Sequence, residues 1–446
     1  IEGLALTRYL VGRGAQVTVS DAKSVEQLGD NLRQLEGLPV RLALGGNRPD
    51  DIADADIVFV SQGVPLDLPA VQAARERGVP LSSVTRLFME LCPAPIVGIT
   101  GSAGKSTTTA LTGEIFRAAF GPDRVHVGGN LGPMPLEHIE AIRPDHWVVL
   151  EISHTQLELT DRSPHAAAVT NISPSHMDRY PTMAEYIALK QRIYAYQGTG
   201  DVLVLNADDP VTRGMAAGAA AQVRFFSMRE ELDGDGTFLR GQEVVLRRRG
   251  KEQRLLLRGD IQLRGEHNVA NVLTACALAG ACGIPAEVMA RTVRAFRGIE
   301  HRLEPVATVA GVEYMNDSIA STPERTIAGL RCFDRPLVLI LGGRDKHLPL
   351  EGLVAEVGRR CTAAVVYGEA GPLLEAALRD LPDLRLVRTE RFADAVQEAA
   401  RLARPGDVVL LSPACTSFDQ FPNFEARGRA FKRLVEELAP RRTGEA

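Results

Sequence analysis

Residues 97–108, with the sequence VGITGSAGKSTT, constrain the fold of this chain more than any other segment. The segment begins as an apolar strand, passes through a glycine-rich turn and continues into a sequence that favours a helix. Glycines allow backbone N–H groups to surround phosphate oxygens, while Lys105 can reach the terminal phosphates and Ser106 can offer a hydroxyl to Mg²⁺. The general pattern has a glycine at position 99, where this chain has Ile99. The segment predicts an α/β protein that uses a nucleoside triphosphate.

Length and composition limit the class of protein further. The chain has 446 residues, which predicts about three domains at roughly 100–200 residues each. Its net charge of −5 offers no basic excess to attract nucleic acid or an anionic membrane. No run reaches the roughly 18 apolar residues of a membrane span, and no export signal opens the chain. The six cysteines include no CxxC pair, so we expect buried thiols in a cytoplasmic protein.

Two breaks divide the sequence into three parts. A proline-containing break lies at residues 92–95 (CPAP), and a third α/β pattern begins after residues 296–298 (FRG). We therefore expect domains over residues 1–93, 94–298 and 299–446.

Each expected domain has its own pattern of strands and helices. Residues 1–10 already read as a helix, so we expect the first strand of the first domain to be missing. Short alternating runs between residues 223 and 263 predict a β-meander in the second domain. In the third domain the apolar strands at 337–341 and 408–411 end in polar loops, where ligands bind in open α/β sheets.

Chemically active side chains follow several of the expected strands. Asp21 ends one strand, where nucleotide-binding sheets place a residue that meets a ribose or base. Glu151 ends another and is a candidate second anchor for Mg²⁺, although a strand-end carboxylate can also face solvent. His176 follows a third and could ligate a metal, although a single histidine is more often structural.

Two helices carry further candidates. The apolar spacing between Met183 and Tyr194 leaves Lys190 on the flank of a helix, where a solvated lysine is the ordinary expectation. Asn268 and Asn271 lie about one turn apart at the start of an alanine-rich helix. Their amides could contact an adenine edge or cap the helix.

An ordered set of motifs covering nearly the whole chain resembles the Mur ligases, and within them the glutamate-adding branch. The motifs are TGSAGKS (100–106), GGNLG (128–132), EIS (151–153), HMDRY (176–180), NADD (206–209), HNVAN (267–271), HRLE (301–304), NDS (316–318) and LSPACTSFDQF (411–421). The resemblance implies a Rossmann-like UDP-binding domain, a central P-loop ATPase domain and a Rossmann-like C-terminal domain that receives the amino acid. It also implies a monomer that binds UDP-N-acetylmuramoyl-L-alanine and glutamate.

The resemblance also implies roles for individual residues. Catalysis would involve Lys105, Glu151, His176 and Lys190. Mg²⁺ would be bound by Ser106, Glu151, His176 and Lys190, the last as a carbamate formed with CO₂, which turns a cation into an anion beside the metal. ATP would be contacted by Gly101, Gly104, Lys105, Ser106, Thr107, Asn268, Asn271, Arg302 and Asp317. Substrate binding would involve Asp21, Asn130, Lys346, Ser417 and Phe424.

The implied reaction has two steps. ATP converts the lactoyl-alanine carboxylate of UDP-N-acetylmuramoyl-L-alanine into an acyl phosphate, and the amine of D-glutamate then displaces phosphate to form an amide. The protein contributes mainly positioning, charge neutralisation and exclusion of water.

The chain departs from the usual family pattern at four places. Ser102-Ala103 replaces Thr-Asn in the phosphate loop, His154-Thr155 replaces Ser-Phe after Glu-Ile-Ser, and Ser175 replaces an aspartate before His176. Ile319-Ala320-Ser321 stands where Lys-Ala-Thr is commoner near the glutamate site. Because position 319 lacks this cation, the sequence does not distinguish a ligase that adds D-glutamate from the sister ligase that adds L-glutamate.

Several further protein classes share only part of this motif set. A mechanical or signalling P-loop NTPase would have no need for His176 and Lys190 or for an amino-acid domain. Diamino-acid ligases carry Asp-Asn-Pro-Arg, which is absent here, and folate-extending ligases lack the UDP-binding domain. A sugar-nucleotide binder without turnover remains open if the altered loops abolish activity.

Overall fold

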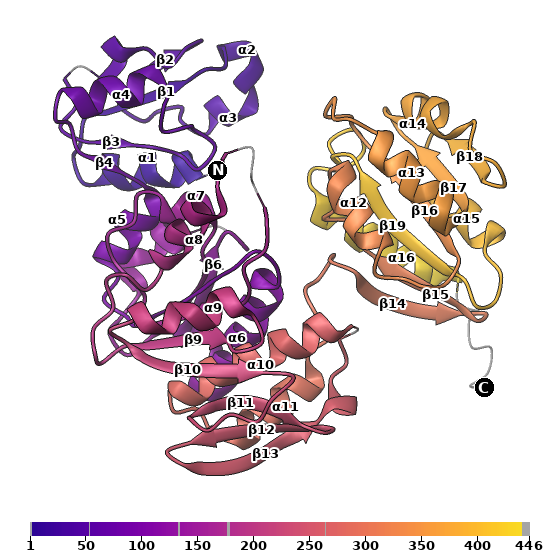
Figure 1. Ribbon diagram of the computed structural model, residues 1–446. Coiled ribbons are helices and arrows are strands. Elements are labelled where there is room, and N and C mark those ends of the chain that lie inside the picture. The colour runs from indigo at the N-terminus through magenta and orange to yellow at the C-terminus, as the bar shows by residue number, and fades with distance from the viewer. Residues whose placement is uncertain (1, 53, 133, 176–178, 264, 439–446) are drawn as a thin grey trace, which may run out of the picture. The chain divides into compact units, whose positions relative to one another are not determined.

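The computed structural model describes residues 2–52, 54–132, 134–175, 179–263 and 265–438 (Figure 1). The chain forms two compact units, Ile1–Phe296 and Arg297–Ala446, and each is described by itself.

The first part of unit 1 contains two short parallel sheets. Val17–Asp21 (β1) pairs in parallel with Val40–Leu44 (β2), and Val58–Phe59 (β3) pairs in parallel with Leu81–Ser82 (β4). The predicted helix at the start and the predicted strand ending at Asp21 are both confirmed. The helices of this part are α1 (Glu2–Gly12), α2 (Val25–Leu28), α3 (Asp30–Arg33), η1 (Pro49–Ile52), α4 (Pro69–Glu76) and α5 (Val84–Leu91).

A nine-stranded sheet forms the centre of unit 1, in the order β13-β12-β11-β10-β9-β8-β5-β7-β6. Pairing is parallel from β6 through to β11 and antiparallel from β11 to β13. The antiparallel meander is therefore β11–β13, and the expectation that it begins at residue 223 is wrong, because β10 pairs in parallel with both neighbours. The strands are β5 (Ile96–Thr100), β6 (Val125–Gly129), β7 (Trp147–Glu151), β8 (Ala166–Val169), β9 (Val202–Asn206), β10 (Gln222–Ser227), β11 (Gly236–Arg240), β12 (Glu243–Arg248) and β13 (Lys251–Leu257).

Apolar helix faces cover both sides of this sheet. One core cluster joins α6 and α10, through residues such as Leu111 and Leu273, to Val97 and Val149 of the strands. A second cluster includes Phe88 of α5 and Tyr186 of α8. The helices are α6 (Lys105–Phe120), η2 (Pro122–Arg124), η3 (Pro135–Ala141), α7 (His154–Leu157), α8 (Met183–Gln191), α9 (Pro210–Met215), η4 (Ala216–Gly218), η5 (Arg258–Asp260), α10 (Glu266–Ala281) and α11 (Ala286–Ala295).

Unit 2 is a six-stranded sheet in the order β14-β15-β19-β16-β17-β18, with β14 antiparallel and the others parallel. Its two faces carry separate core clusters, one with α12, α13 and α14 and the other with α15 and α16. Adjacent strands β15, β19 and β16 end at one edge, so the loops that follow them are neighbours. The elements are β14 (Glu304–Val309), β15 (Val312–Asn316), α12 (Pro323–Leu330), β16 (Leu337–Gly342), α13 (Glu351–Arg360), β17 (Cys361–Tyr367), α14 (Gly371–Leu378), β18 (Arg385–Thr389), α15 (Phe392–Leu402), β19 (Val408–Ala414) and α16 (Phe424–Leu438).

The cysteines follow the sequence expectation only in part. All six are free thiols, but Cys332 is exposed, whereas Cys276 and Cys415 are buried. None of the helices within the described ranges combines the length and the apolar character that a membrane span requires.

Candidate active site

The phosphate loop closes around the start of α6. Gly104 has a φ of 82°, and a Cβ at this position would lie 2.3 Å from the side-chain oxygen of Asn271, so a larger residue is excluded on both counts. Nζ of Lys105 donates to the carbonyl oxygens of Gly101 and Ser102 at 2.9 and 3.0 Å. The loop, with Ser106 and Thr107 in the first turn of α6, therefore places a cation and a helix N-terminus at one point.

Asn171, which follows β8, holds the loop from the side. Its side-chain oxygen accepts from the backbone N–H of Ala103, and its amide donates to the carbonyl of Ala103, both at 3.0 Å. The hydroxyl of Thr170 donates to the same carbonyl at 2.6 Å. Asparagine is the commoner family residue at position 103, and Ala103 lacks its side-chain amide. Asn171, which follows the neighbouring strand β8, instead contacts the backbone of Ala103 with its own amide.

Ser102 connects the loop to two other segments. Its hydroxyl donates to the carbonyl of Ser173 at 3.0 Å, accepts from the Ser173 N–H at 2.9 Å and lies 3.3 Å from the hydroxyl of Tyr186. The serine in place of threonine thus keeps the hydroxyl that these contacts use.

Glu151 presents a buried carboxylate at the end of β7. Its side chain is 1% exposed, and Oε1 accepts from the amide of Asn130 at 2.6 Å. The other oxygen, Oε2, is buried and has no hydrogen-bond partner in the part of the chain that the structure describes. A buried carboxylate oxygen left without a partner is costly, and oxygen is the ligand that Mg²⁺ prefers, so the site fits a hard cation.

Lys190 is buried, contrary to the solvated position expected from helix spacing. It is 1% exposed, its Nζ donates to the hydroxyl of Thr100 at 3.0 Å, and it lies 5.4 Å from the ring centre of Tyr186. Burial, assisted by the charge of Lys105, lowers the pKa of Lys190 to about 7, and Glu151 opposes the shift. The structure therefore brings Lys105, Glu151 and Lys190 into one electrostatic cluster.

His176 lies outside the described residues, so its predicted position has no structural account. Further along the chain, Arg179 and Tyr180 share a defined partner, Glu158. Arg179 donates twice to Glu158, at 3.1 and 2.8 Å, and the hydroxyl of Tyr180 donates to the same carboxylate at 2.6 Å. His154, one of the departures from the family pattern, packs edge-on against the ring of Tyr180 at 5.6 Å.

The two candidate adenine residues lie beside the phosphate loop. The amide of Asn271 donates to the side-chain oxygen of Asn268 at 2.9 Å, and Thr108 of α6 donates to the oxygen of Asn271 at 3.3 Å. Asp21 lies apart from these residues along the chain, where its carboxylate accepts from the backbone N–H of Lys23 at 2.9 Å.

In unit 2, Arg302 and Asp317 come together at the start of β14 and the end of β15. His301 and Leu303, on either side of Arg302, both adopt left-handed conformations, with φ of 66° and 42°. Such strained residues persist only where surrounding contacts fix them. Here the N–H of Leu303 donates to Asp317 at 3.2 Å, and the N–H of Ile319 donates to the carbonyl of His301 at 3.1 Å.

Asp317 is a buried carboxyl group. It accepts from the hydroxyl of Ser412 at 2.9 Å. Burial raises its pKa to about 7, while the hydrogen bonds from Ser412 and Leu303 and the charges of Arg302 and Arg325 oppose the rise.

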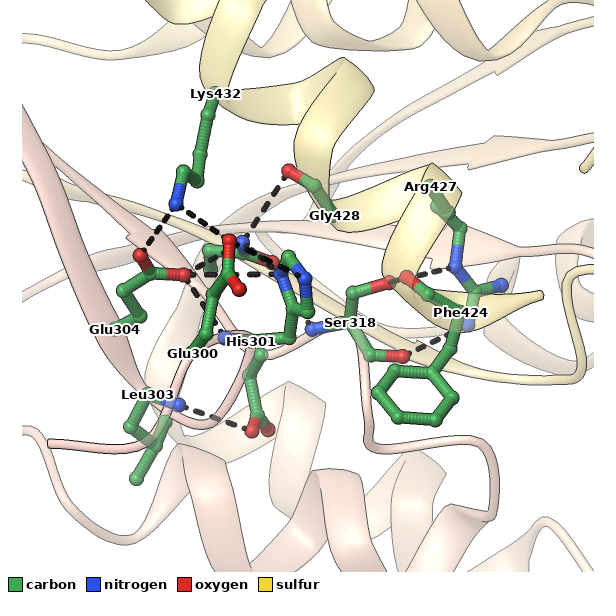
Figure 2. Close-up of polar contacts among 11 residues, drawn as sticks. Glu300, His301, Leu303, Glu304, Ser318, Phe424, Arg427, Gly428 and Lys432 are labelled. Carbon is green, nitrogen blue, oxygen red and sulfur yellow. Dashed lines mark hydrogen bonds and ion pairs between the residues drawn. The ribbon is translucent and has the colours of Figure 1, made fainter. Parts of the chain in front are cut away.

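Arg427 of α16 contacts the loops that follow three strands, and Figure 2 shows its hydrogen bonds to Ser318. Its guanidinium is fully buried. It donates to the hydroxyl and carbonyl of Ser318 at 3.0 and 2.9 Å and to the carbonyl of Cys415 at 3.2 Å, and it reaches the carbonyl of Gly342 at 3.4 Å. The hydroxyl of Ser318 in turn donates to the carbonyl of Phe424 at 2.8 Å. Arg427 therefore fixes the loops after β15, β16 and β19 relative to α16.

A cluster of Glu300, His301 and Glu304 has ligand atoms within 4.8 Å of one another (Figure 2). Lys432 donates to Glu300 at 2.9 Å and to Glu304 at 2.8 Å, so an ammonium group already bridges the two carboxylates. The cluster is therefore an ion-pair network that supports the Arg302 loop.

The candidate amino-acid residues lie on these same loops. Lys346 is exposed after β16 and donates to the hydroxyl of Ser321 at 3.4 Å. Ser417 is 3% exposed, and the ring of Phe424 packs edge-on against His301 at 6.2 Å. Gly343 has a φ of 123°, and a Cβ there would lie 1.9 Å from the carbonyl oxygen of Thr416, which lets the two loops pair through Arg344 and Thr416.

Sequence reasoning missed Arg427, Thr100 and Asn171. An arginine in an amphipathic helix ordinarily faces solvent, so no local pattern marks Arg427 as buried. Thr100 ends β5 and Asn171 follows β8, so the strand-end signal that identified Glu151 could have identified them.

The fold and the site define a nucleotide-using α/β enzyme. Three family models match the chain: a Mur ligase MurD-like N-terminal domain over residues 1–83, a Mur ligase middle domain over 99–279 and a Mur ligase glutamate ligase domain over 301–415. A UDP-N-acetylmuramoylalanine–D-glutamate ligase of Symbiobacterium thermophilum is 44% identical over 441 residues, covering 98% of this chain and 96% of that protein. The protein of the same name from Roseiflexus sp. is 42% identical over 449 residues, covering 98% and 96%. The chain belongs to the Mur ligase family.

Solved structures show the same architecture. The UDP-N-acetylmuramate-alanine ligase MurC of Thermotoga maritima matches with a TM-score of 0.56 and 19% identity, covering 97% of this chain and 96% of that one. MurF of Acinetobacter baumannii matches with a TM-score of 0.56 and 18% identity, covering 96% and 92%. The expected α/β fold with three domains is confirmed.

The buried position of Lys190 predicts a specific pH dependence of stability. Between pH 7 and 10.5 the unfolded chain keeps a proton on this amine that the folded chain releases, so folding becomes more favourable as the pH rises. Relative to Lys190→Met, the wild-type free energy of unfolding should rise by up to about 1.4 kcal/mol per pH unit in this window. Urea unfolding at pH 7, 8 and 9 in CO₂-free buffer, followed by fluorescence of the single tryptophan Trp147, measures the difference.

The variant Lys251→Met is the control for the loss of one positive charge, because it removes an exposed lysine from β13. Parallel pH profiles for wild type and Lys190→Met would contradict the lowered pKa.

Proposed function

We propose that this chain is the ATP-dependent ligase that adds D-glutamate to UDP-N-acetylmuramoyl-L-alanine in peptidoglycan synthesis. The observation that carries the proposal is the convergence of Lys105, Glu151 and Lys190 at the phosphate loop. In a chain 44% identical to a D-glutamate ligase over 98% of its length, this convergence supports an intact ATP-using centre.

The reaction proceeds through an acyl phosphate. A carboxylate oxygen of the alanyl group attacks the γ-phosphorus of ATP, and ADP leaves with the electron pair of the broken P–O bond. The amine of glutamate then attacks the acyl carbon, phosphate leaves, and loss of a proton from nitrogen gives the amide. Lys105 and the N-terminus of α6 stabilise the charge on the transferring phosphoryl group.

Mg²⁺ fits the donors at this centre. Ser106, Glu151 and His176 would hold it. The observation that favours a cation there is the buried oxygen of Glu151, which has no hydrogen-bond partner among the described residues. When bound, the ion neutralises phosphate charge. Lys190 would react with CO₂ to form a carbamate, because an amine with a pKa of about 7 is partly neutral and nucleophilic at physiological pH.

The remaining roles follow the family pattern. We assign residues 1–93 to the UDP-substrate domain, 94–298 to the ATP domain and 299–446 to the amino-acid domain, in a cytoplasmic monomer. Gly101, Gly104 and Thr107 would contact phosphates, Asn268 and Asn271 adenine, and Arg302 and Asp317 the ribose and phosphates. Asp21 and Asn130 would contact the UDP-sugar, and Lys346, Ser417 and Phe424 the incoming glutamate.

Loss of Lys105 should abolish turnover while leaving the fold intact. Lys105→Ala removes the cation that reaches the terminal phosphates, so ATP-dependent phosphate release should fall below about 1% of wild type, a loss of more than about 2.7 kcal/mol of transition-state stabilisation. Circular dichroism checks the fold of the variant. A well-folded Lys105→Ala protein with the wild-type rate would overturn the ligase assignment.

Lys190→Ala should also be inactive, because the anion beside the metal is lost. Small carboxylates such as acetate or formate can occupy the space of the carbamate, so they should restore part of the rate. The assay measures phosphate release with and without added carboxylate. High activity of Lys190→Ala in CO₂-free buffer would rule out the carbamate.

The choice of amino acid is tested by comparing D- and L-glutamate as substrates. We expect L-glutamate to have at least tenfold lower kcat/KM, a difference of about 1.4 kcal/mol. Lys346→Ala should raise the KM for glutamate much more than the KM for ATP, because a charge-assisted hydrogen bond contributes about 1.5–3 kcal/mol. If L-glutamate is the better substrate, the L-glutamate-adding sister function is correct.

A further inference from the structure

A second cation lies close to Lys346 on an element that the family pattern does not mark. Arg325 is an exposed residue in the first turns of α12, and its Nη1 donates to the carbonyl oxygen of Ile319 at 3.3 Å. The positive charge of Arg325 also acts on Lys346: partial desolvation of the Lys346 amine lowers its pKa, and Arg325 lowers it further. Two cations therefore lie within electrostatic range at the edge where β15 and β16 end.

A short turn joins the two cations through hydrogen bonds. The carbonyl of Ile319, which accepts from Arg325, also accepts from the N–H of Ser321 at 2.8 Å. The hydroxyl of Ser321 in turn accepts from Nζ of Lys346 at 3.4 Å. Residues 319–321 thus separate Arg325 from Lys346 by a single turn of backbone.

Neither Arg325 nor Lys346 forms an ion pair with a carboxylate among the residues that the structure describes, although the charge of Arg325 also acts on Asp317. The hydrogen bonds of Arg325 and Lys346 go to a carbonyl and a hydroxyl. The acids next to these cations in sequence are Glu324, which is exposed, and Asp345, which pairs with His347 at 2.9 Å. Asp317 is buried, and its hydrogen bonds come from Ser412 and Leu303. Two like charges held near one another repel, and an anionic ligand between them would relieve the repulsion.

We propose that Arg325 is a specificity-determining residue that binds one carboxylate of the incoming dicarboxylic amino acid, while Lys346 binds the other. The proposal rests on the function proposed above and deepens it. Position 319 carries an apolar, partly buried isoleucine where the family pattern has a lysine, and Arg325 supplies a cation to the same turn from the following helix. A guanidinium has five N–H donors, so its bond to Ile319 leaves others for a carboxylate.

The test removes this charge and then restores it at the other position. Arg325→Gln should raise the KM for D-glutamate about tenfold or more and leave the KM for ATP within about twofold. Ile319→Lys combined with Arg325→Gln should regain a large part of the lost affinity, because the cation returns to the turn. The control Arg359→Gln removes an exposed arginine of α13 that pairs with Glu356, and it should leave both KM values unchanged.

D-Glutamine, which replaces the side-chain carboxylate with a neutral amide, identifies the carboxylate that Arg325 binds. A loss of selectivity for D-glutamate over D-glutamine in Arg325→Gln assigns Arg325 to the side-chain carboxylate. An equal rise in KM for both substrates assigns it to the α-carboxylate, and both results support the proposal.

Three results would overturn the proposal. A KM for glutamate in Arg325→Gln within twofold of wild type excludes a contact with substrate, and an equal rise in the KM for ATP indicates a general structural effect. If wild type releases phosphate with neither D- nor L-glutamate, the proposed function fails, and the role of Arg325 fails with it. A wild-type enzyme that turns over normally, with Arg325→Gln unchanged, refutes the role of Arg325 alone.

Discussion

Parallel strand pairing is the constraint on which both units depend. Because neighbouring parallel strands end at the same edge, Thr100 and Glu151 come together in unit 1. In unit 2 the loops after β15 and β16 lie on either side of the loop after β19. The strand backbones are already hydrogen-bonded within the sheet, so the loops that follow them are the segments whose groups can contact a ligand. The candidate residues Glu151 and Lys346 accordingly lie at sheet edges of this kind, one in each unit.

Two buried ionisable groups at those sheet edges have pKa values far from their ordinary ones. Burial disfavours the charged form of an ionisable group, which lowers the pKa of Lys190 and raises that of Asp317, both to about 7. Arg427 remains buried because carbonyl and hydroxyl oxygens accept its N–H groups. These three groups thus have polar partners, and those partners connect segments that are distant in sequence.

The departures from the family pattern are matched by contacts with neighbouring segments. Ser102 keeps the hydroxyl that binds Ser173, and Asn171 contacts the backbone of Ala103 through both ends of its amide. At position 319 a lysine is absent, and Arg325 reaches the same turn. Each contact requires a hydroxyl, an amide or a cation at a particular place in the fold. Residues at more than one sequence position can supply such a group.

Local sequence determined a large part of this description. Apolar runs and glycine turns located the phosphate loop, the strand that ends at Glu151 and the last helix, because these signals depend on residues adjacent in the chain. Tertiary structure alone decided that Lys190 and Arg427 are buried and that Arg325 lies next to the turn at Ile319. Burial and the approach of distant residues depend on which helix packs over which strand, and no spacing along the sequence encodes that contact.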